Sequence, residues 1–379
     1  MAIDRNRSLE ARQVFRCRTM VLIRPTYHRV PGVRAGARSA TLAATLLVML
    51  AFAAGSARAS TLVIEGAGNG HGVGMSQDGA LGLARHGWSY QAILAHYYTA
   101  TTLGRAPAKS VIRVLVGSRV VRVALERYVR GVVAAEMPSG WPLAALQAQA
   151  VASRTYALTS HAGGSRFDVY SDTRSQVYLG VAAETSASNA AVASTAGQIV
   201  LYGGHPATTY FSASSGGMTE NIENSFIGAQ PQPWLVGVPD PYDSGPAARW
   251  KVTISFTSLA AHLRGLYMGS LLGIEVSKRG VSPRIVSARV LGSLGSTSVT
   301  GPELASRLGL GSTWLYFFIR DGSLVRAEPD RSGHPASPPS APGGSPAAPA
   351  TPPPALPQGG QQAPDAPVGF SATGGVLAR

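Results

Sequence analysis

The spacing of hydrophobic residues between positions 60 and 327 alternates between a strand period and a helix period. Runs of β-branched and aromatic residues predict strands; they cover residues 61–65, 111–124 as a pair, 198–202, 206–212, 251–256, 274–278, 284–291 and 314–319. Helical spacing after Ser89 predicts a helix capped by that residue, and the spacing of Thr300 and Glu303 predicts another. The pattern predicts an α+β fold with mainly antiparallel strands.

One predicted helix carries an acid at the end of its hydrophobic stripe. The stripe begins at Leu125, and Glu136 lies about 20° off it at roughly 100° per residue. Pro138 ends this helix, because the residue before proline avoids the helical region. Burial and neighbouring charge would set the pKa of such a carboxyl, so Glu136 is a candidate catalytic acid. Glu126 and Arg130, four residues apart on the opposite face, are interpreted as a solvated ion pair.

A second helix is predicted to begin near Pro142 and to carry polar residues on its hydrophobic stripe. Gln147 and Arg154 lie about 40° and 20° from Leu143 on the same arithmetic. An unpaired buried charge is costly, so Arg154 needs a partner or a water-filled cleft, and Glu136 is the expected partner. The pair is open to two interpretations: a structural ion pair between helices, or a catalytic carboxylate beside a cation.

Glycine occupies every second position from Gly66 to Gly74. If this segment is extended, one of its sides lacks side chains, and another backbone or a polymer can approach closely. His71 and Gln77 from the same segment are candidates for substrate binding or for a hydrogen-bonded structural pair. A dinucleotide fingerprint is excluded because histidine stands where the third glycine is needed.

Residues 212–221 are dense in hydroxyl and amide side chains. Such side chains suit sugar hydroxyl and acetamido groups, and the alternative is a loop held by its own side chains. Candidate sugar-binding residues are Ser214, Ser215, Thr219 and Asn221. Glu220 is a second carboxylate candidate, expected to be exposed, and the segment lacks the GxSxG motif of serine hydrolases.

The sequence predicts no metal site and no cofactor. Its eight histidines show no metal-ligand spacing, and its only cysteine, Cys17, lies in the N-terminal segment.

Charge and composition predict an exported protein. Of the net charge of +14, residues 1–59 contribute +8 through ten arginines and two acids, which argues against a nucleic-acid partner. A short apolar stretch near residues 40–54 and an A-x-A pattern before Ser60 predict a signal peptide over residues 1–59; if uncleaved, it would hold the protein at the membrane. Residues 328–379, rich in proline, alanine and glycine, are predicted to be a disordered tail.

Several motifs together resemble the SpoIID/LytB family, the sporulation stage II protein D and amidase-enhancer group. They are YVRGVVAAEMPSGWPLAALQAQAVASRTYA, SSGGMTEN, PWLVGVPDPYD and GHGVGMSQDGA. The resemblance covers residues 61–320 and predicts one SpoIID-like domain over 60–327, with its main body at 105–327. In the family's arrangement the GHGVGMSQ segment comes last, so here residues 60–104 resemble a segment circularly permuted to the N-terminus. Some members bind zinc through cysteine and histidine, but the matching cysteines are missing here.

The resemblance implies a glycan-binding cleft and a lytic transglycosylase, secreted or associated with the cell wall, that acts on peptidoglycan glycan strands. The family's catalytic glutamate matches Glu136 in AEMP. It would protonate the bond leaving the muramic acid and then accept the proton of that sugar's C6 hydroxyl, forming a 1,6-anhydro ring. Arg154 would orient Glu136, and Gln147 with the hydroxyl residues would position the sugar.

Two other functions remain open from the sequence. One is a non-enzymatic protein that binds peptidoglycan or stimulates a cell-wall amidase. The other is a hydrolase of another polysaccharide, which would need a second carboxylate such as Asp168, Asp172 or Glu220 near Glu136.

Overall fold

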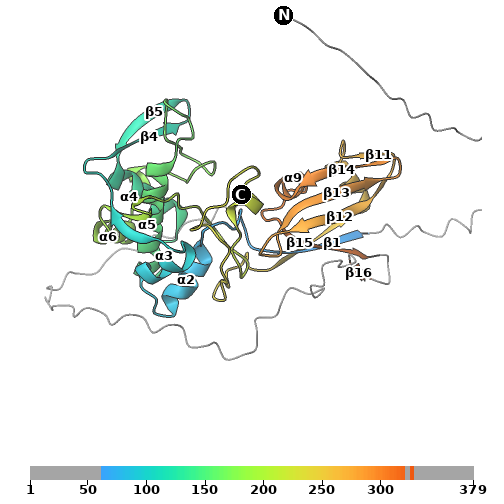
Figure 1. The fold of residues 1–379 in the computed structure, drawn as a ribbon, viewed down its shortest axis with the longest axis horizontal. Helices are drawn as coiled ribbons and strands as arrows, with labels where there is room; N and C mark the ends of the chain where they lie inside the picture. The colour runs from blue at the N-terminus through green and yellow to red at the C-terminus, as the bar shows by residue number, and fades with distance from the viewer. Residues whose placement is uncertain (1–60, 321–324, 328–379) are drawn as a thin grey trace, which may run out of the picture. The chain divides into compact units, whose positions relative to one another are not determined.

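The computed structural model describes residues 61–320 and 325–327 (Figure 1). The predicted leader, residues 1–59, and the predicted tail, residues 328–379, lie outside these residues. Among the described helices, none has the length and hydrophobicity needed to cross a membrane. Helices and mainly antiparallel sheets are both present, so the predicted α+β class is confirmed.

Two four-stranded antiparallel sheets pack around one hydrophobic core. The first has the order β10 (Trp250–Ser255), β1 (Thr61–Ala67), β15 (Trp314–Arg320) and β16 (Val325–Ala327). The second has the order β11 (Tyr267–Met268), β14 (Gly295–Thr300), β13 (Ile285–Gly292) and β12 (Leu271–Arg279). Helices α8 (Phe256–His262) and α9 (Gly301–Arg307) contribute Leu259 and Leu304 to this core.

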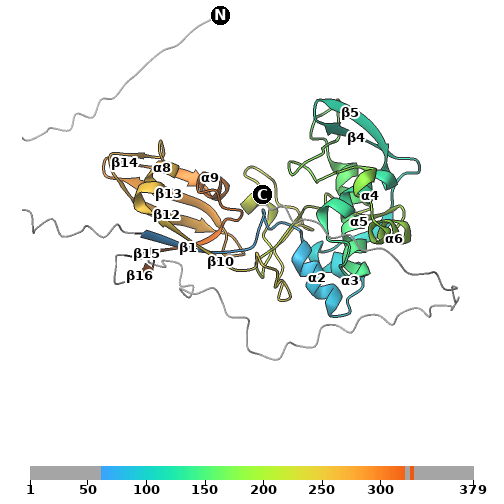
Figure 2. The ribbon, with the colours of Figure 1, turned by 180° about the vertical axis from the view of Figure 1, so that it is seen from behind.

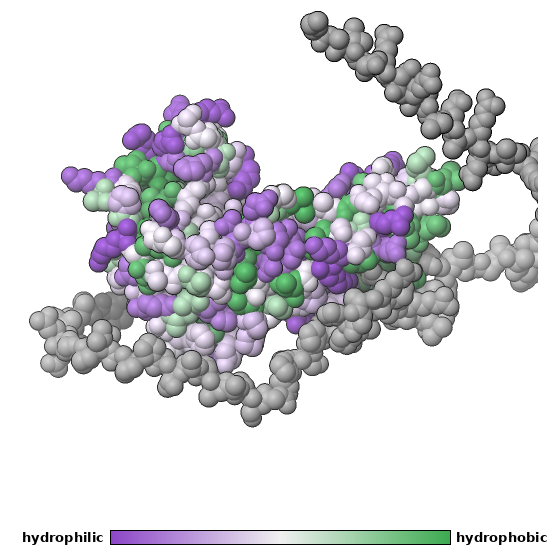
Figure 3. Space-filling model, in the orientation of Figure 1, coloured by the Kyte–Doolittle hydropathy of each residue, from purple (hydrophilic) through white to green (hydrophobic). Residues whose placement is uncertain are grey.

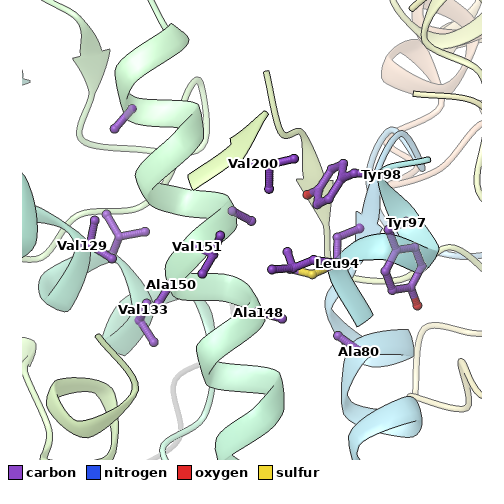
Figure 4. Close-up of a cluster of buried hydrophobic side chains, with 14 of the residues drawn as sticks. Ala80, Leu94, Tyr97, Tyr98, Val129, Val133, Ala148, Ala150, Val151 and Val200 are labelled. Atoms are coloured by element: carbon purple, nitrogen blue, oxygen red, sulfur yellow. The ribbon is translucent and has the colours of Figure 1, made fainter. Parts of the chain in front are cut away.

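A second core surrounds helix α5 (Leu143–Thr159). The helices that pack on it are α2 (Gln77–Arg85), α3 (Tyr90–Tyr97), α4 (Leu125–Glu136) and α6 (Ser186–Ser194). In Figure 4, Val129 and Val133 of α4 lie on one side of α5, and Leu94 and Tyr97 of α3 lie on the other. Because α5 is covered from several directions, most of its residues are buried, including polar ones.

Short strands border this helical core. One sheet joins β3 (Thr102–Arg105), β7 (Gln198–Tyr202) and β8 (His205–Pro206), and another joins β5 (Arg119–Ala124), β4 (Val111–Val116) and β6 (Val169–Tyr170). The parallel pair β2 (Met75–Ser76) and β9 (Phe211–Ser212), the short helix α7 (Ile222–Ser225) and the 3-10 helix η1 (Val181–Ala183) complete the elements. On the face shown in Figure 3, hydrophobic residues are interspersed with hydrophilic ones.

The first described strand lies among strands from the other end of the chain. β1 pairs antiparallel with β10 on one side and β15 on the other, and it is drawn in blue beside the orange strands in Figures 1 and 2. Thr61 is opposite Arg320 in this register. The start of β1 and the end of β15 are therefore neighbours, which is the geometry that a circular permutation requires.

Most predicted elements are confirmed, including α3 with its Ser89 cap, the β4–β5 hairpin, α4, α5 and the Thr300 cap of α9. One predicted strand needs correction, and some elements were not predicted. The 206–212 strand is only two short pieces, β8 and β9, and the polar strand β14 was not predicted because it consists largely of serine, threonine and glycine.

After β1 ends at Ala67, the glycine-rich segment does not continue as an extended strand. Gly68, Gly70, Gly72 and Gly74 all have positive φ, between 71° and 99°. A Cβ at Gly74 would lie 2.1 Å from the carbonyl oxygen of Tyr210, so the close approach expected from glycine does occur, and the approaching backbone is the chain's own.

Candidate active site

The site is built on Glu136, the last residue of α4. Met137 after it is extended, as expected for a residue that precedes Pro138. The stripe that leads to Glu136 packs into the helical core through Tyr128, Val132 and Val133. Glu136 itself is half-buried, so its carboxyl lies where the core meets the surface.

Two donors from distant segments hold the carboxyl of Glu136. The backbone N–H of Val177 donates to Oε1 at 2.6 Å, and Nε2 of Gln77 donates to Oε2 at 3.1 Å. Gln77 is the first residue of α2, where the hydroxyl of Ser76 caps the helix by accepting from Gly79 N at 3.1 Å. This cap marks the end of the glycine-rich segment and fixes Gln77 as the first residue of α2.

Burial raises the pKa of Glu136, and the hydrogen bonds from Val177 and Gln77 lower it, with a net increase. Desolvation disfavours the charged carboxylate, whereas donors to it favour that form. A carboxyl with a raised pKa holds a proton closer to neutral pH, which is what a general acid requires.

Aromatic side chains pack behind Glu136. Tyr128 and Tyr178 lie with ring centroids 5.0 Å apart, and Tyr178 packs against Gly131 of α4, where a Cβ would meet its ring at 2.7 Å. The buried Tyr128 hydroxyl lies beside Gln176 and makes no hydrogen bond of ordinary geometry among the described residues. The segment that carries Val177 is therefore packed onto the helix that carries Glu136.

The predicted pairing of Arg154 with Glu136 was wrong. Arg154 is fully buried and forms a two-point ion pair with Glu126, with both N···O distances 2.8 Å. Its Nη1 also donates to the carbonyl of Gln198 at 3.0 Å. Arg130 pairs instead with Glu184 at 3.3 Å, so the predicted Glu126–Arg130 pair was wrong as well. The angular position of a residue around its helix does not determine how far along the helix axis a neighbouring helix places a partner side chain.

The glutamine of α5 near Glu136 is Gln149, which sequence analysis missed. Its Oε1 lies 3.5 Å from Nε2 of Gln77, whereas Gln147 donates to Ser194 of α6 at 2.9 Å. Gln147 was predicted to lie at the site because a single buried face was expected for α5, but α5 is buried on most sides.

The hydroxyl-rich loop faces inward. Ser214 and Ser215 are fully buried and donate to Asp243 at 2.8 Å and Asp240 at 2.7 Å. Thr219 is also buried, and its hydroxyl accepts from the backbone N–H of Val238 at 2.7 Å. These hydrogen bonds hold the loops together. The three hydroxyl groups predicted to contact a sugar are buried inside the protein.

Two other residues of this loop also have internal partners. Asn221 bonds to Glu223 at 3.0 Å and accepts from Gly237 N at 2.7 Å. Glu220 is fully buried, and its carboxylate accepts from the backbone N–H groups of Val281 and Ser282. The expectation that Glu220 is exposed was therefore wrong.

The buried acids Asp240 and Asp243 were missed as structural residues, although they stand in the PDPYD motif. Burial and the charge of Asp243 raise the pKa of Asp240 to about 7, although hydrogen bonds from Ser215 and Tyr97 lower it. Tyr97 donates to Asp240 at 2.8 Å. This cluster joins the loops to α3 and to Ser76, one residue before Gln77.

His71 lies in an aromatic cluster and does not form the predicted pair with Gln77. Its Nδ1 accepts from Val73 N at 3.0 Å, and its ring lies 5.0 Å from Phe226 and 5.9 Å from Tyr210. Burial lowers the pKa of His71 to about 4, so the ring is neutral at neutral pH. Within the described ranges, no group of histidine, cysteine and acidic residues could hold a metal ion.

Comparison with known proteins finds relatives of part of this chain. The family model described as Stage II sporulation protein, SpoIID, matches residues 117–202, which include Glu136 but not Gln77. An uncharacterized protein of Brachyspira hyodysenteriae is 38% identical over 161 residues, which are 42% of this chain and 42% of that protein. The match therefore spans less than half of that relative's length.

Two relatives from Bacillus subtilis have descriptive names. Stage II sporulation protein D is 29% identical over 259 residues, covering 62% of this chain and 72% of that protein. The amidase enhancer is 36% identical over 126 residues, covering 33% of this chain and 17% of that protein. These matches confirm the resemblance to the SpoIID/LytB family, which the family model itself covers over residues 117–202.

Proposed function

We propose that this protein is an exported lytic transglycosylase that cleaves the MurNAc–GlcNAc bond of peptidoglycan glycan strands, with Glu136 as its acid/base. The single observation that carries the proposal is the half-buried Glu136 carboxyl with a raised pKa, held by Val177 and Gln77. A cell-wall role is also supported by the names of the relatives, stage II sporulation protein D and amidase enhancer.

Glu136 would act twice in this reaction. Its carboxylic acid donates a proton to the glycosidic oxygen as the bond from the MurNAc anomeric carbon to that oxygen breaks. The C6 hydroxyl oxygen of the same MurNAc then bonds to the anomeric carbon, and its proton returns to the Glu136 carboxylate. The products are a shortened strand and a 1,6-anhydroMurNAc end, and no water is consumed.

The other acids considered have structural partners, which favours a mechanism with one carboxylate. Asp168 accepts from Arg113 Nε at 3.1 Å, and Asp172 accepts from Arg174 Nη2 at 2.7 Å. Glu220 is buried in its own set of donors. A hydrolase would instead need a second carboxylate to act on water or on the sugar.

The decisive experiment is a digest of peptide-stripped glycan strands by the purified protein without its predicted leader, analysed by mass spectrometry. A Glu136→Gln protein, shown by circular dichroism to be folded, runs beside it. We expect products that end in 1,6-anhydroMurNAc, absent with the variant. Products that carry an added water would identify a hydrolase instead.

A second candidate function is a non-catalytic protein that binds peptidoglycan and enhances a cell-wall amidase. The similarity to the amidase enhancer of Bacillus subtilis favours it. No cleavage of intact or stripped glycan by the folded protein, together with increased activity of an added cell-wall amidase, would support this second function.

A further inference from the structure

Glu136 closes a ring of polar contacts between four chain segments. From Glu136 the ring passes to Gln77 of α2, whose Nε2 lies 3.5 Å from Oε1 of Gln149 in α5. Gln149 donates to the hydroxyl of Ser153 at 2.9 Å, and the carbonyl of Ser153 accepts from Gln176 at 3.2 Å. The next residue is Val177, whose N–H returns to Glu136.

The ring is buried except at Glu136 and Val177, which are half-buried. Gln149 and Ser153 are fully buried, and Gln77 is only 7% exposed. Buried amides are costly unless their donors and acceptors are satisfied, and the Gln149 amide is used at both ends, because Oε1 accepts from Gln77 and Nε2 donates to Ser153. The contact with Gln149 of α5 therefore restricts the Gln77 amide to an orientation that aims Nε2 at Glu136.

The two donors to Glu136 distinguish its oxygens. Both groups can only donate, and the shorter bond, from Val177 N–H to Oε1 at 2.6 Å against 3.1 Å from Gln77 to Oε2, favours Oε1 as the carbonyl oxygen of the protonated acid. The acid proton then resides on Oε2, the oxygen that contacts Gln77. When this proton leaves, the contact from Gln77 becomes a bond to a charged oxygen, and such bonds are roughly twice as strong as neutral ones.

We propose that Gln77 is a positioning residue of the active site, which stabilises the Glu136 carboxylate that forms as the proton is delivered, and which Gln149 holds in place. The inference rests on the proposed function, because it assigns Gln77 a part in the proton transfer by Glu136. A donor that is stronger after proton delivery lowers the barrier, whereas one that is equally strong before and after does not.

The inference also gives residues 61–104 a role in the site. The family model matches residues 117–202, which supply Glu136, Gln149, Ser153 and Val177. Gln77 comes from outside that match, in the segment carried by β1 and α2. The carboxyl of Glu136 has only one of its two donors without this segment.

The test uses the purified protein without its leader and two variants, Gln77→Met and Gln77→Glu. Methionine retains the length of the side chain and removes the amide, and glutamate places a second carboxyl beside Glu136. The control is Gln91→Met, which makes the same change on the exposed face of α3. Circular dichroism and thermal unfolding confirm folding, and Gln77→Glu decides the test if the methionine variant does not fold.

Two readouts separate positioning from mere packing. With stripped glycan strands, we expect Gln77→Met to lower kcat about 10- to 100-fold while KM changes by less than about threefold. Titration of the 13C-labelled Glu136 carboxyl by NMR, assigned with Glu136→Gln, should show its pKa raised in Gln77→Met and raised further in Gln77→Glu. Gln91→Met should match the wild type in both.

An unchanged Glu136 pKa in the Gln77 variants would overturn the inference, as would a wild-type kcat in the folded Gln77→Met protein. The NMR titration does not need glycan cleavage. If the wild type cleaves no glycan, the proposed function fails by itself, and the titration still decides whether Gln77 stabilises the Glu136 carboxylate.

Discussion

Arg154 of α5 and Glu126 of α4 are joined by two hydrogen bonds of 2.8 Å. Arg154 is fully buried, and Glu126 also accepts from Gly197 N at 3.1 Å, just before β7. The pair therefore connects the first turn of α4, the centre of α5 and the start of β7. The pair stabilises α4 at its first turn, whereas Glu136 lies at the other end of the same helix.

Replacing Glu126 by glutamine should destabilise the protein, because it leaves the buried Arg154 without a counter-charge. We expect a loss of about 1.5–3 kcal/mol in the free energy of unfolding, measured by urea denaturation at neutral pH. The control is Glu303→Gln, which removes an exposed pair with Arg307 at 3.8 Å and should cost less than about 0.5 kcal/mol. Equal effects of the two variants would contradict the structural role of Arg154.

Asp240 should contribute a decrease in the stability of the domain as pH rises toward neutrality, as Asp78 with a pKa of about 6 also does, whereas the buried neutral His71 contributes an increase. Burial raises the pKa of Asp240 from an ordinary 3.8 to about 7, so the folded state binds a proton that the unfolded state has released. The stabilisation from this proton is present at low pH and is lost as pH rises through about 7. Asp240→Asn should reduce the difference in unfolding free energy between pH 5 and pH 8.

The control for this pH dependence is Asp172→Asn. Arg174 holds the pKa of Asp172 at about 2, so this group stays ionised throughout the range from pH 5 to pH 8. Its removal should leave the difference between the two pH values unchanged. A difference in Asp240→Asn as large as in the wild type would show that another group is responsible.

The register of β1 and β15 predicts that the chain tolerates circular permutation. Thr61 is opposite Arg320 in an antiparallel pair, so a two-residue hairpin turn can join them. Because residues 107–109 are exposed, the chain can be opened between residues 108 and 109. The permuted order 109–320, turn, 61–108 should give the same circular dichroism spectrum, with a melting temperature within about 10 °C of the unpermuted protein.

A matched control opens the chain inside α5, between residues 150 and 151, where both neighbours are buried. That protein should not fold, because the cut divides the helix at the centre of the core. Failure of the 108/109 permutant to fold would contradict the pairing of Thr61 with Arg320.

Sequence by itself determined the local features of this protein. Periodicity placed Glu136 at the inner end of α4, and proline chemistry ended the helix there, because both depend on residues within a few positions. The caps at Ser89 and Thr300 were found for the same reason. The family motif pointed to Glu136 and the glycine-rich segment pointed to Gln77, but neither pointed to the contact between them.

Only the tertiary structure decided which side chains meet. Arg154 pairs with Glu126 and not with Glu136, and Gln149 rather than Gln147 contacts Gln77. These pairings depend on the angle at which α4 and α5 cross and on how far one helix is shifted along the other. The inward-facing Ser214 and Ser215 depended on Asp240 and Asp243, more than 20 residues away. Helical periodicity specifies the angle of a side chain around its own axis, whereas its partners are set by long-range packing, which no local pattern contains.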